Sequence, residues 1–237
     1  TDIAMECGFT SSALFSRSFR DFFKMTPTQF RRNFSYDKIE ISNYGQTISN
    51  ERKEIINQKT YITPINRTKW EVIGDDRIKY VEIKELEDIE IAYLRYSGNY
   101  KKNNKLFKDM FDKLYRWGYA RDLIDEKTRD ILIYNDSPHI TNENKLRVSA
   151  CITIPLETKV SGEIGKLILK GGKYGVIRFH ISLNDFFFAW GWVYGVWLPS
   201  SGYLPDNKYC FEVYLKEKDI ERADFFIIDI YVPIIPG

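Results

Sequence analysis

One carboxylate in this sequence lies in a strand that is otherwise apolar and aromatic. Glu212 occurs in the run YCFEVYL, where strand alternation places Phe211 on one face and both Glu212 and Tyr214 on the other. A desolvated carboxylate attracts positive charge, and each aromatic face adds a cation–π contact of about 0.5–2 kcal/mol. Glu212 is therefore a candidate for the floor of a cup that binds a flat cation. The spacing alone equally allows a solvated glutamate on an exposed sheet face.

Further aromatic residues are candidates for the same cup. Tyr134, in the run DILIYND, is equivalent to Glu212 in an internal repeat, and alternation in IDIYVPI sends Tyr231 to the face opposite the isoleucines of that run. The ends of helices and strands can bring further rings over the cup. The candidate ligand-binding residues are Glu212, Tyr134, Tyr214, Tyr231, Trp190, Tyr93 and Tyr100. Most of the other aromatic residues are expected in the core.

Residue types for other common site chemistries lack the spacing that those chemistries need. The two histidines and three cysteines are scattered along the chain and form no set of metal ligands. The sequence contains neither a glycine-rich phosphate loop nor a nucleophile elbow. We therefore assign no catalytic residue, no metal and no cofactor, and we do not expect an enzyme.

The composition is that of a globular protein. The 237 residues are 43% hydrophobic and 29% charged, which excludes a disordered chain, a collagen and a disulfide-rich scaffold. A net charge of +2 does not by itself indicate a nucleic-acid or membrane partner, and no apolar run approaches the ~18 residues of a membrane span. Three widely separated cysteines favour reduced thiols, so we expect a cytoplasmic protein. The chain begins at Thr1 rather than at a methionine, so we expect further residues upstream.

Residues 77–237 carry the internal repeat and are predicted to form one α+β domain. Each half reads strand, strand, helix, strand, strand, with helices expected over residues 101–117 and 183–197. In both helices, apolar residues recur at the three–four spacing of a buried face. Two such halves predict a pseudo-twofold domain with one antiparallel sheet and two main helices. Residues 34–76 are polar and are predicted to be a linker with one short helix around residues 50–58.

Residues 1–33 have a helical pattern that is interrupted by a tight turn. Gly8 can adopt the positive φ that a turn between two helices requires, and Thr10 or Ser11 can cap the second helix. The run IAMECGFTSSALFSRSFRDFFKMTPTQFRR resembles the second helix-turn-helix of AraC-type DNA-binding domains. Residues 1–33 are therefore identified as the C-terminal part of such a domain.

This resemblance implies a recognition helix that begins at Ser11 and enters the major groove. It brings Ser12, Ala13, Ser16 and Arg17 near base edges and Arg20 near phosphate. Arg17 is the strong candidate among them for a bidentate contact with guanine. The sequence lacks the first helix-turn-helix of the pair, so this fragment alone is expected to bind DNA weakly or not at all.

Residues 78–235 resemble the effector-binding domain of GyrI-like proteins, which also occurs in AraC-type and MerR-type regulators. The resemblance is carried, in order, by VEIKELEDIEIAYLRYSGNY, SPHIT, RVSACITI, GGKYGVIRF, WLPSSGY, FEVYL and IDIYVPI. It implies the fold predicted above, and it implies that Glu212 is a pocket residue rather than a solvated glutamate.

Together, the two resemblances predict a ligand-responsive transcription regulator. Its expected partners are promoter DNA, for the full-length protein, and an amphipathic, cationic or aromatic small molecule; RNA polymerase is a further candidate partner, and no membrane is expected. Two alternatives stay open. One is a GyrI-like hydrolase of reactive small molecules with Glu212 as general base. The other is a protein-binding module, as in the topoisomerase inhibitors that share this domain.

Overall fold

The computed structural model describes residues 61–66, 68–100, 105–136, 141–215 and 225–237, as well as Ala13, Ser16, Arg17, Arg20 and Thr26. The chain divides into two compact units, Thr1–Asn50 and Glu51–Gly237. All strands and helices named below belong to the second unit. The short helix expected around residues 50–58 lies outside the described residues.

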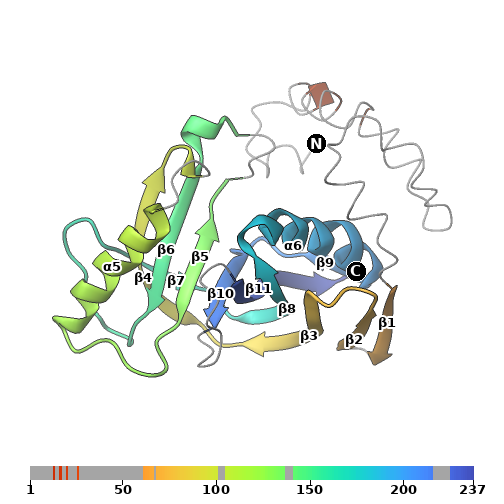
Figure 1. Cartoon of the computed structure of the whole chain (residues 1–237), viewed down its shortest axis with the longest axis horizontal. Helices are drawn as coiled ribbons and strands as arrows, with labels where there is room; N and C mark the ends of the chain where they lie inside the picture. Colours follow the sequence, from red (N-terminus) through yellow and green to blue (C-terminus); the bar gives the residue numbers. More distant parts are fainter. Residues whose placement is uncertain are drawn as a thin grey trace. The chain divides into compact units, whose positions relative to one another are not determined.

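The second unit consists of strands with two main helices (Figure 1). Its strands are β1 (Tyr61–Asn66), β2 (Lys69–Ile73), β3 (Ile78–Leu86), β4 (Ile89–Ser97), β5 (Asp130–Tyr134), β6 (Arg147–Thr153), β7 (Gly165–Leu169), β8 (Gly172–Ser182), β9 (Tyr203–Pro205), β10 (Phe211–Leu215) and β11 (Phe225–Pro236). Its α-helices are α5 (Leu106–Tyr119), α6 (Phe186–Trp192) and the single turn α7 (Leu198–Ser200). Short 3-10 turns cover Glu143–Lys145 and Leu183–Asp185, and a π-helical turn covers Val193–Trp197.

The described strands form one antiparallel sheet whose order confirms the predicted pseudo-twofold repeat. The order is β1-β2-β3-β8-β11-β10-β5-β6-β4-β7, with β9 added beside β11. The strands of the two halves correspond in pairs: β3 with β7, β4 with β8, β5 with β10, and β6 with β11. When each strand is replaced by its counterpart, the order from β3 to β7 becomes the same order in reverse. The pseudo-twofold axis therefore passes between β5 and β10. The first strand of each half pairs with the second strand of the other half, which locks the two halves together.

The predicted linker does not extend to residue 76. Strands β1 and β2 form a hairpin, and β2 pairs with β3 at the edge of the sheet. Trp70 is only 6% exposed and meets the ring of Trp197 edge-on at 6.0 Å. On β2 the positions on either side of Trp70 are Lys69 and Glu71. The segment therefore has the polar composition of a linker, although one face of the strand is buried.

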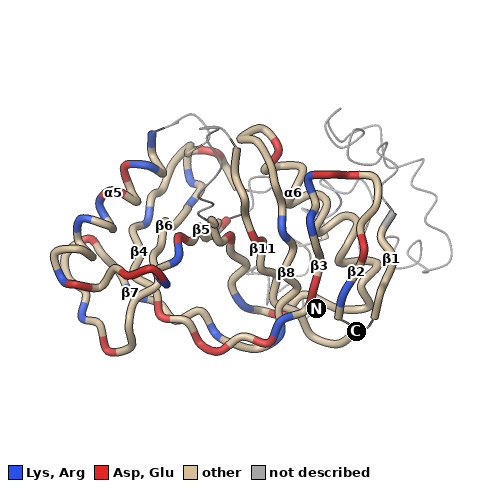
Figure 2. The backbone as a smooth tube through the Cα atoms, turned by 60° about the horizontal axis from the view of Figure 1, so that its bottom comes forward, with Lys and Arg blue, Asp and Glu red and all other residues tan. Residues whose placement is uncertain are grey.

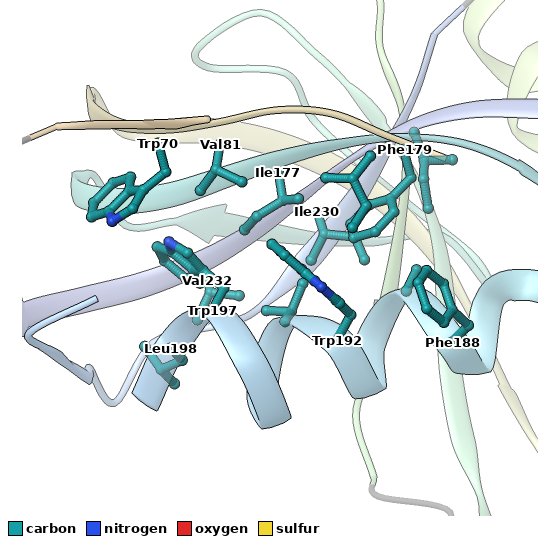
Figure 3. Packing of buried hydrophobic residues seen from close by; sticks show 14 of the residues in the cluster. Trp70, Val81, Ile177, Phe179, Phe188, Trp192, Trp197, Leu198, Ile230 and Val232 are labelled. Carbon is teal, nitrogen blue, oxygen red and sulfur yellow. The ribbon is translucent and has the colours of Figure 1, made fainter. Parts of the chain in front are cut away.

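The two main helices cover one face of the sheet, one in each half. Helix α5 packs its buried Met110 and Leu114 against strands β4 and β6, and its exposed positions carry both basic and acidic residues (Figure 2). Helix α6 and the π-helical turn pack Trp192 and Trp197 against Phe179, Ile177 and their neighbours (Figure 3). The expected helix over residues 183–197 is thus present, but it is divided into 3-10, α and π turns.

The opposite face of the sheet carries a buried cluster built from strand residues. Its buried members are Ile91, Ile131, Ile133, Cys151, Leu169, Tyr174, Val176, Phe211, Val213 and Tyr231. All of these residues belong to strands. Both faces of the central strands are therefore apolar. Among the described residues, no helix has the length and hydrophobicity needed to span a bilayer.

Candidate functional site

Glu212 lies at the centre of the sheet, beside the pseudo-twofold axis. On β10 it stands opposite Ile230 of β11 and Leu132 of β5. Ile230 belongs to the apolar cluster under α6, and Leu132 belongs to the cluster under α5. Glu212 thus occupies the boundary between the cores of the two halves, and its side chain is fully buried, with an exposed fraction of 0%.

Three donors from three elements hold the Glu212 carboxylate. The indole Nε1 of Trp190, on α6, donates to Oε1 at 2.5 Å. The hydroxyl of Tyr214, two residues along β10, donates to Oε2 at 2.8 Å, and the hydroxyl of Tyr134, on β5, donates to Oε2 at 3.4 Å. Among the described residues, no lysine or arginine forms an ion pair with Glu212. Within the part of the chain that the structure describes, the carboxylate is therefore hydrogen-bonded but has no countercharge.

The ionisation of these groups follows from burial. Burial raises the pKa of Glu212 from its ordinary value to about 7, although the three hydrogen bonds act in the opposite direction. Burial, together with the charge of Glu212, raises the pKa of the Tyr134 and Tyr214 phenols well above 10. Both phenols are therefore neutral donors at physiological pH, whereas Glu212 is balanced between its charged and neutral forms.

Aromatic rings surround the carboxylate. Trp190 meets Tyr134 edge-on at 6.4 Å and stacks on Tyr194 at 5.9 Å, and Tyr100 lies 5.7 Å from Tyr134. On the other side of Glu212, Phe186 stacks on Tyr214 at 6.2 Å. Phe226 meets both of these rings edge-on. We call this group the aromatic cage; its members are Trp190, Tyr134, Tyr214, Tyr100, Tyr194, Phe186 and Phe226.

The structure brings together five of the seven residues proposed from the sequence: Glu212, Tyr134, Tyr214, Trp190 and Tyr100. Three cage members were missed. Phe186 and Tyr194 stand four residues before and after Trp190 on its helical segment, so helical spacing from Trp190 could have found them. Phe226 lies diagonally across β11 from Tyr214, which only the strand register reveals.

Tyr231 and Tyr93 lie on the opposite face of the sheet, so the expectation that they share the cup with Glu212 is wrong. Tyr231 pairs with Phe211 in the register of β11 and β10, and the two rings stack at 4.7 Å. Tyr93 packs against the same cluster of strand residues. Alternation assigns the residues of one strand to its two faces. When both faces are apolar, however, alternation does not show which residues of two neighbouring strands lie on the same face of the sheet.

The cage is closed in this conformation. Trp190, Tyr134 and Tyr214 are half-buried and lie between solvent and the fully buried Glu212. A surface hollow of about 400 Å³ lies elsewhere, lined by Ile168, Lys170, Asn207, Lys208 and Tyr209, and contains no cage residue. Within the described ranges, no cluster of histidine, cysteine or acidic side chains has the arrangement of a metal site. Because Glu212 is 0% exposed, a ligand can contact it only if some of the surrounding side chains move.

The candidate DNA-binding residues belong to the first unit. Ala13, Ser16, Arg17 and Arg20 are helical, and the side chains of Ala13, Arg17 and Arg20 are exposed. Ser12 lies outside the described residues. Arg17 and Arg20 are three residues apart, so the two guanidinium groups lie on the same side of this helix.

Comparison with known families agrees with this geometry. Residues 80–235, which include every cage residue, match the GyrI-like small molecule binding domain. The chain belongs to the GyrI-like family. Residues 1–32 match the bacterial regulatory helix-turn-helix proteins of the AraC family. Both resemblances read from the sequence are thereby confirmed.

Relatives of this GyrI-like chain are named DNA gyrase inhibitors. A DNA gyrase inhibitor of Yersinia enterocolitica is 33% identical over 106 residues, which span 43% of this chain and 66% of that protein. A DNA gyrase inhibitor of Escherichia fergusonii is 28% identical over 158 residues, or 65% of this chain and 97% of that protein. The chain therefore spans about two thirds of the first relative and nearly all of the second.

Solved structures share the fold of the GyrI-like domain. The crystal structure of the EcmrR C-terminal domain aligns with a TM-score of 0.52 at 13% identity, over 68% of this chain and 99% of that one. EcmrR in a cryo-EM complex with DNA aligns with a TM-score of 0.55 at 15% identity, over 68% of this chain and 59% of that one. At these identities the likeness establishes the fold.

Proposed function

We propose that this chain is a ligand-responsive transcription regulator, in which the aromatic cage binds an amphipathic small-molecule cation. The observation that carries the proposal is the environment of Glu212, a fully buried carboxylate that has no countercharge among the described residues and lies in a cage of aromatic rings. Promoter DNA and the small molecule are the proposed partners, with RNA polymerase as a further candidate.

Electrostatics favour a cation in this cage. An unpaired carboxylate in a medium of low dielectric is costly, and a cation placed against it recovers much of that cost. Because both carboxylate oxygens already accept hydrogen bonds, the ligand needs no N–H donor to compensate the charge. Each ring that meets the cation contributes a further cation–π interaction. These features favour delocalised or quaternary cations over primary ammonium groups.

The helix-turn-helix segment supports a role in transcription. A DNA-binding segment and a small-molecule domain on one chain form a switch when the ligand binds one conformation or DNA state better than another. EcmrR, which has the same fold in its C-terminal domain, is known in a complex with DNA. We therefore assign the ligand a regulatory role.

Isothermal titration with tetraphenylphosphonium and with uncharged triphenylphosphine oxide tests the site. We expect the cation to bind more tightly and Glu212→Gln to weaken the cation about tenfold or more, because the variant removes the charge but keeps the shape. Glu90→Gln is the matched control, since Glu90 is a mostly buried carboxylate paired with Lys166 outside the cage. Equal affinity of both compounds for the wild type and the Glu212 variant contradicts the proposal.

The same variant separates sensing from hydrolysis. A pKa of about 7 suits Glu212 to act as a general base, which favours a GyrI-like hydrolase as the second candidate. In a hydrolase, Glu212→Gln abolishes turnover of an uncharged electrophilic substrate but preserves its binding. In a sensor, the variant loses affinity for cations and no turnover exists to be lost.

A further inference from the structure

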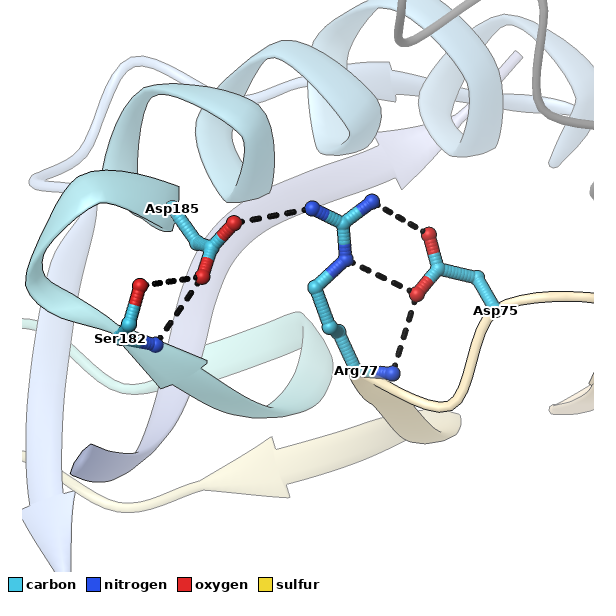
Figure 4. A network of polar contacts seen from close by, with 4 residues as sticks. All are labelled: Asp75, Arg77, Ser182 and Asp185. Carbon is cyan, nitrogen blue, oxygen red and sulfur yellow. Dashed lines mark hydrogen bonds and ion pairs between the residues drawn. The ribbon is translucent and has the colours of Figure 1, made fainter. Parts of the chain in front are cut away.

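The N-terminal end of α6 is fixed by a network of charged groups (Figure 4). Asp185 precedes α6 and caps its own turn, because its Oδ2 accepts hydrogen bonds from the Ser182 backbone N–H at 3.1 Å and from the Ser182 hydroxyl at 2.6 Å. The other oxygen, Oδ1, accepts a hydrogen bond from Nη1 of Arg77 at 2.9 Å. Arg77 is 108 positions away in the sequence, so this contact ties α6 to a distant part of the fold.

Arg77 is itself held rigidly in the turn between β2 and β3. Its Nε and Nη2 donate to the two oxygens of Asp75 at 3.0 and 2.8 Å, and its backbone N–H donates to Asp75 Oδ1 at 3.0 Å. The guanidinium lies 3.5 Å from the ring centre of Phe188, in the first turn of α6. Arg77 therefore contacts the start of α6 at two points, the Asp185 carboxylate and the Phe188 ring.

The two residues that Arg77 contacts lie on a different side of the helix from Trp190, the α6 residue that donates to Glu212. Asp185 and Phe188 are three positions apart and share one side, whereas Trp190, two positions beyond Phe188, points elsewhere. There its indole donates to Glu212. The two contacts of Arg77 thus attach one side of α6 to the β2–β3 turn, while the side that carries Trp190 closes the cage. Beyond α6 the helix widens into the π-helical turn Val193–Trp197, a less regular segment than α-helix.

We propose that Arg77 is a positioning residue for the ligand site, whose bridge between Asp75 and Asp185 holds α6 in the closed position over Glu212. The proposal rests on the proposed function, because closure has meaning only if a ligand enters the cage. Ligand entry displaces Trp190 and therefore shifts α6 against this bridge. The bridge sets the fraction of molecules that are open, and the apparent affinity for the ligand scales with that fraction.

Isothermal titration of the full chain with tetraphenylphosphonium tests this role. Loss of the bridge in Arg77→Gln or in Asp185→Asn is expected to lower the apparent Kd about three- to tenfold, because more molecules are open before binding. The double variant is expected to equal the stronger single variant, since both remove one bridge. Arg77→Lys, which keeps the positive charge near Asp185, is expected to lie between the wild type and Arg77→Gln.

Arg178→Gln is the matched control. Arg178 makes a two-point ion pair with Asp229 on the face of the sheet opposite the cage, so its loss removes the same chemistry without touching α6. We expect its Kd to stay within about twofold of the wild type. An equal shift in Arg178→Gln, or an unchanged or higher Kd in both Arg77→Gln and Asp185→Asn, overturns the proposal.

Hydrogen exchange without ligand separates failure of this inference from failure of the proposed function. In Arg77→Gln and Asp185→Asn the amides of α6 are expected to exchange several-fold faster, while those of α5 keep their rates. If tetraphenylphosphonium binds no variant but α6 exchanges faster, the proposed cation site fails and the bridge stands. If the exchange rates of the α6 amides are unchanged in both variants, the proposed role of the bridge is wrong, whatever Kd values the titrations give.

Discussion

At Glu212, burial and hydrogen bonding act on the ionisation in opposite directions. Their balance places its pKa at about 7 in the folded chain, above the ordinary value of 4.5. The folded state therefore binds a proton more readily than the unfolded state. It follows that Glu212 lowers the free energy of unfolding as pH rises from 4.5 to about 7, by about 3 kcal/mol in total. A cation bound against the carboxylate offsets this loss.

The affinity of the cage for a cation should depend on pH. Cations bind the ionised carboxylate, so tetraphenylphosphonium affinity is expected to rise about tenfold between pH 6 and pH 8 and to level off above. Titrations at several pH values measure this directly. Triphenylphosphine oxide should show no such rise, and Glu212→Gln should abolish it. A flat profile for the cation in the wild type contradicts a Glu212-centred site.

The segment that carries Trp190 depends on one close approach between elements. The π-helical turn seats the fully buried Trp197 directly on β8, where Gly175 leaves room for its ring. A Cβ at position 175 would lie 1.9 Å from an atom of that ring. The glycine therefore sets the distance between this helical segment and the sheet.

Gly175→Ala is expected to lower the free energy of unfolding by about 1–3 kcal/mol, because the new methyl group forces Trp197 out of its position. Chemical denaturation followed by tryptophan fluorescence measures the change. Gly195→Ala is the control, since a Cβ at the exposed position 195 meets no atom within 4 Å. That substitution should leave stability unchanged or raise it by about 0.5–1 kcal/mol. Equal effects of the two substitutions contradict the packing argument.

On the scale of the whole molecule, duplication creates the site. Glu212 lies on β10 of one repeat and Tyr134 on β5 of the other, and the pairing of these two central strands at the pseudo-twofold axis brings them into contact. The cage then draws Trp190 from the helical segment of the second half and Tyr100 from the chain before α5 in the first half. A ligand in the cage therefore contacts both halves at once.

A ligand that binds across both halves is expected to alter the DNA affinity of the full-length regulator. Saturating tetraphenylphosphonium should change its affinity for the DNA upstream of its gene at least fivefold, as measured by fluorescence anisotropy, and Glu212→Gln should abolish the change. Unchanged DNA affinity combined with inhibition of gyrase supercoiling would instead favour the protein-binding function named for its relatives.

The sequence by itself determined the repeat and the two main helices, and it made Glu212 a candidate site residue. Hydrophobic periodicity is a local property, so it identifies strands and helices from neighbouring residues. It failed for the β1–β2 hairpin, where polar residues outnumber the buried Trp70 and the partly buried Val72 on one side of the second strand. It also failed to separate Tyr231 and Tyr93 from the cage.

Only the tertiary structure decided which side chains surround Glu212. The register of β10 against β11 places Tyr231 opposite Phe211 and leaves Phe226 diagonal to Tyr214, and no local pattern encodes a register between strands that are apolar on both faces. The ionisation of Glu212 likewise depends on burial under a helical segment from elsewhere in the chain. The bridge from Arg77 to Asp185 joins residues 108 positions apart, a pairing that follows from the packing of α6 against the β2–β3 turn.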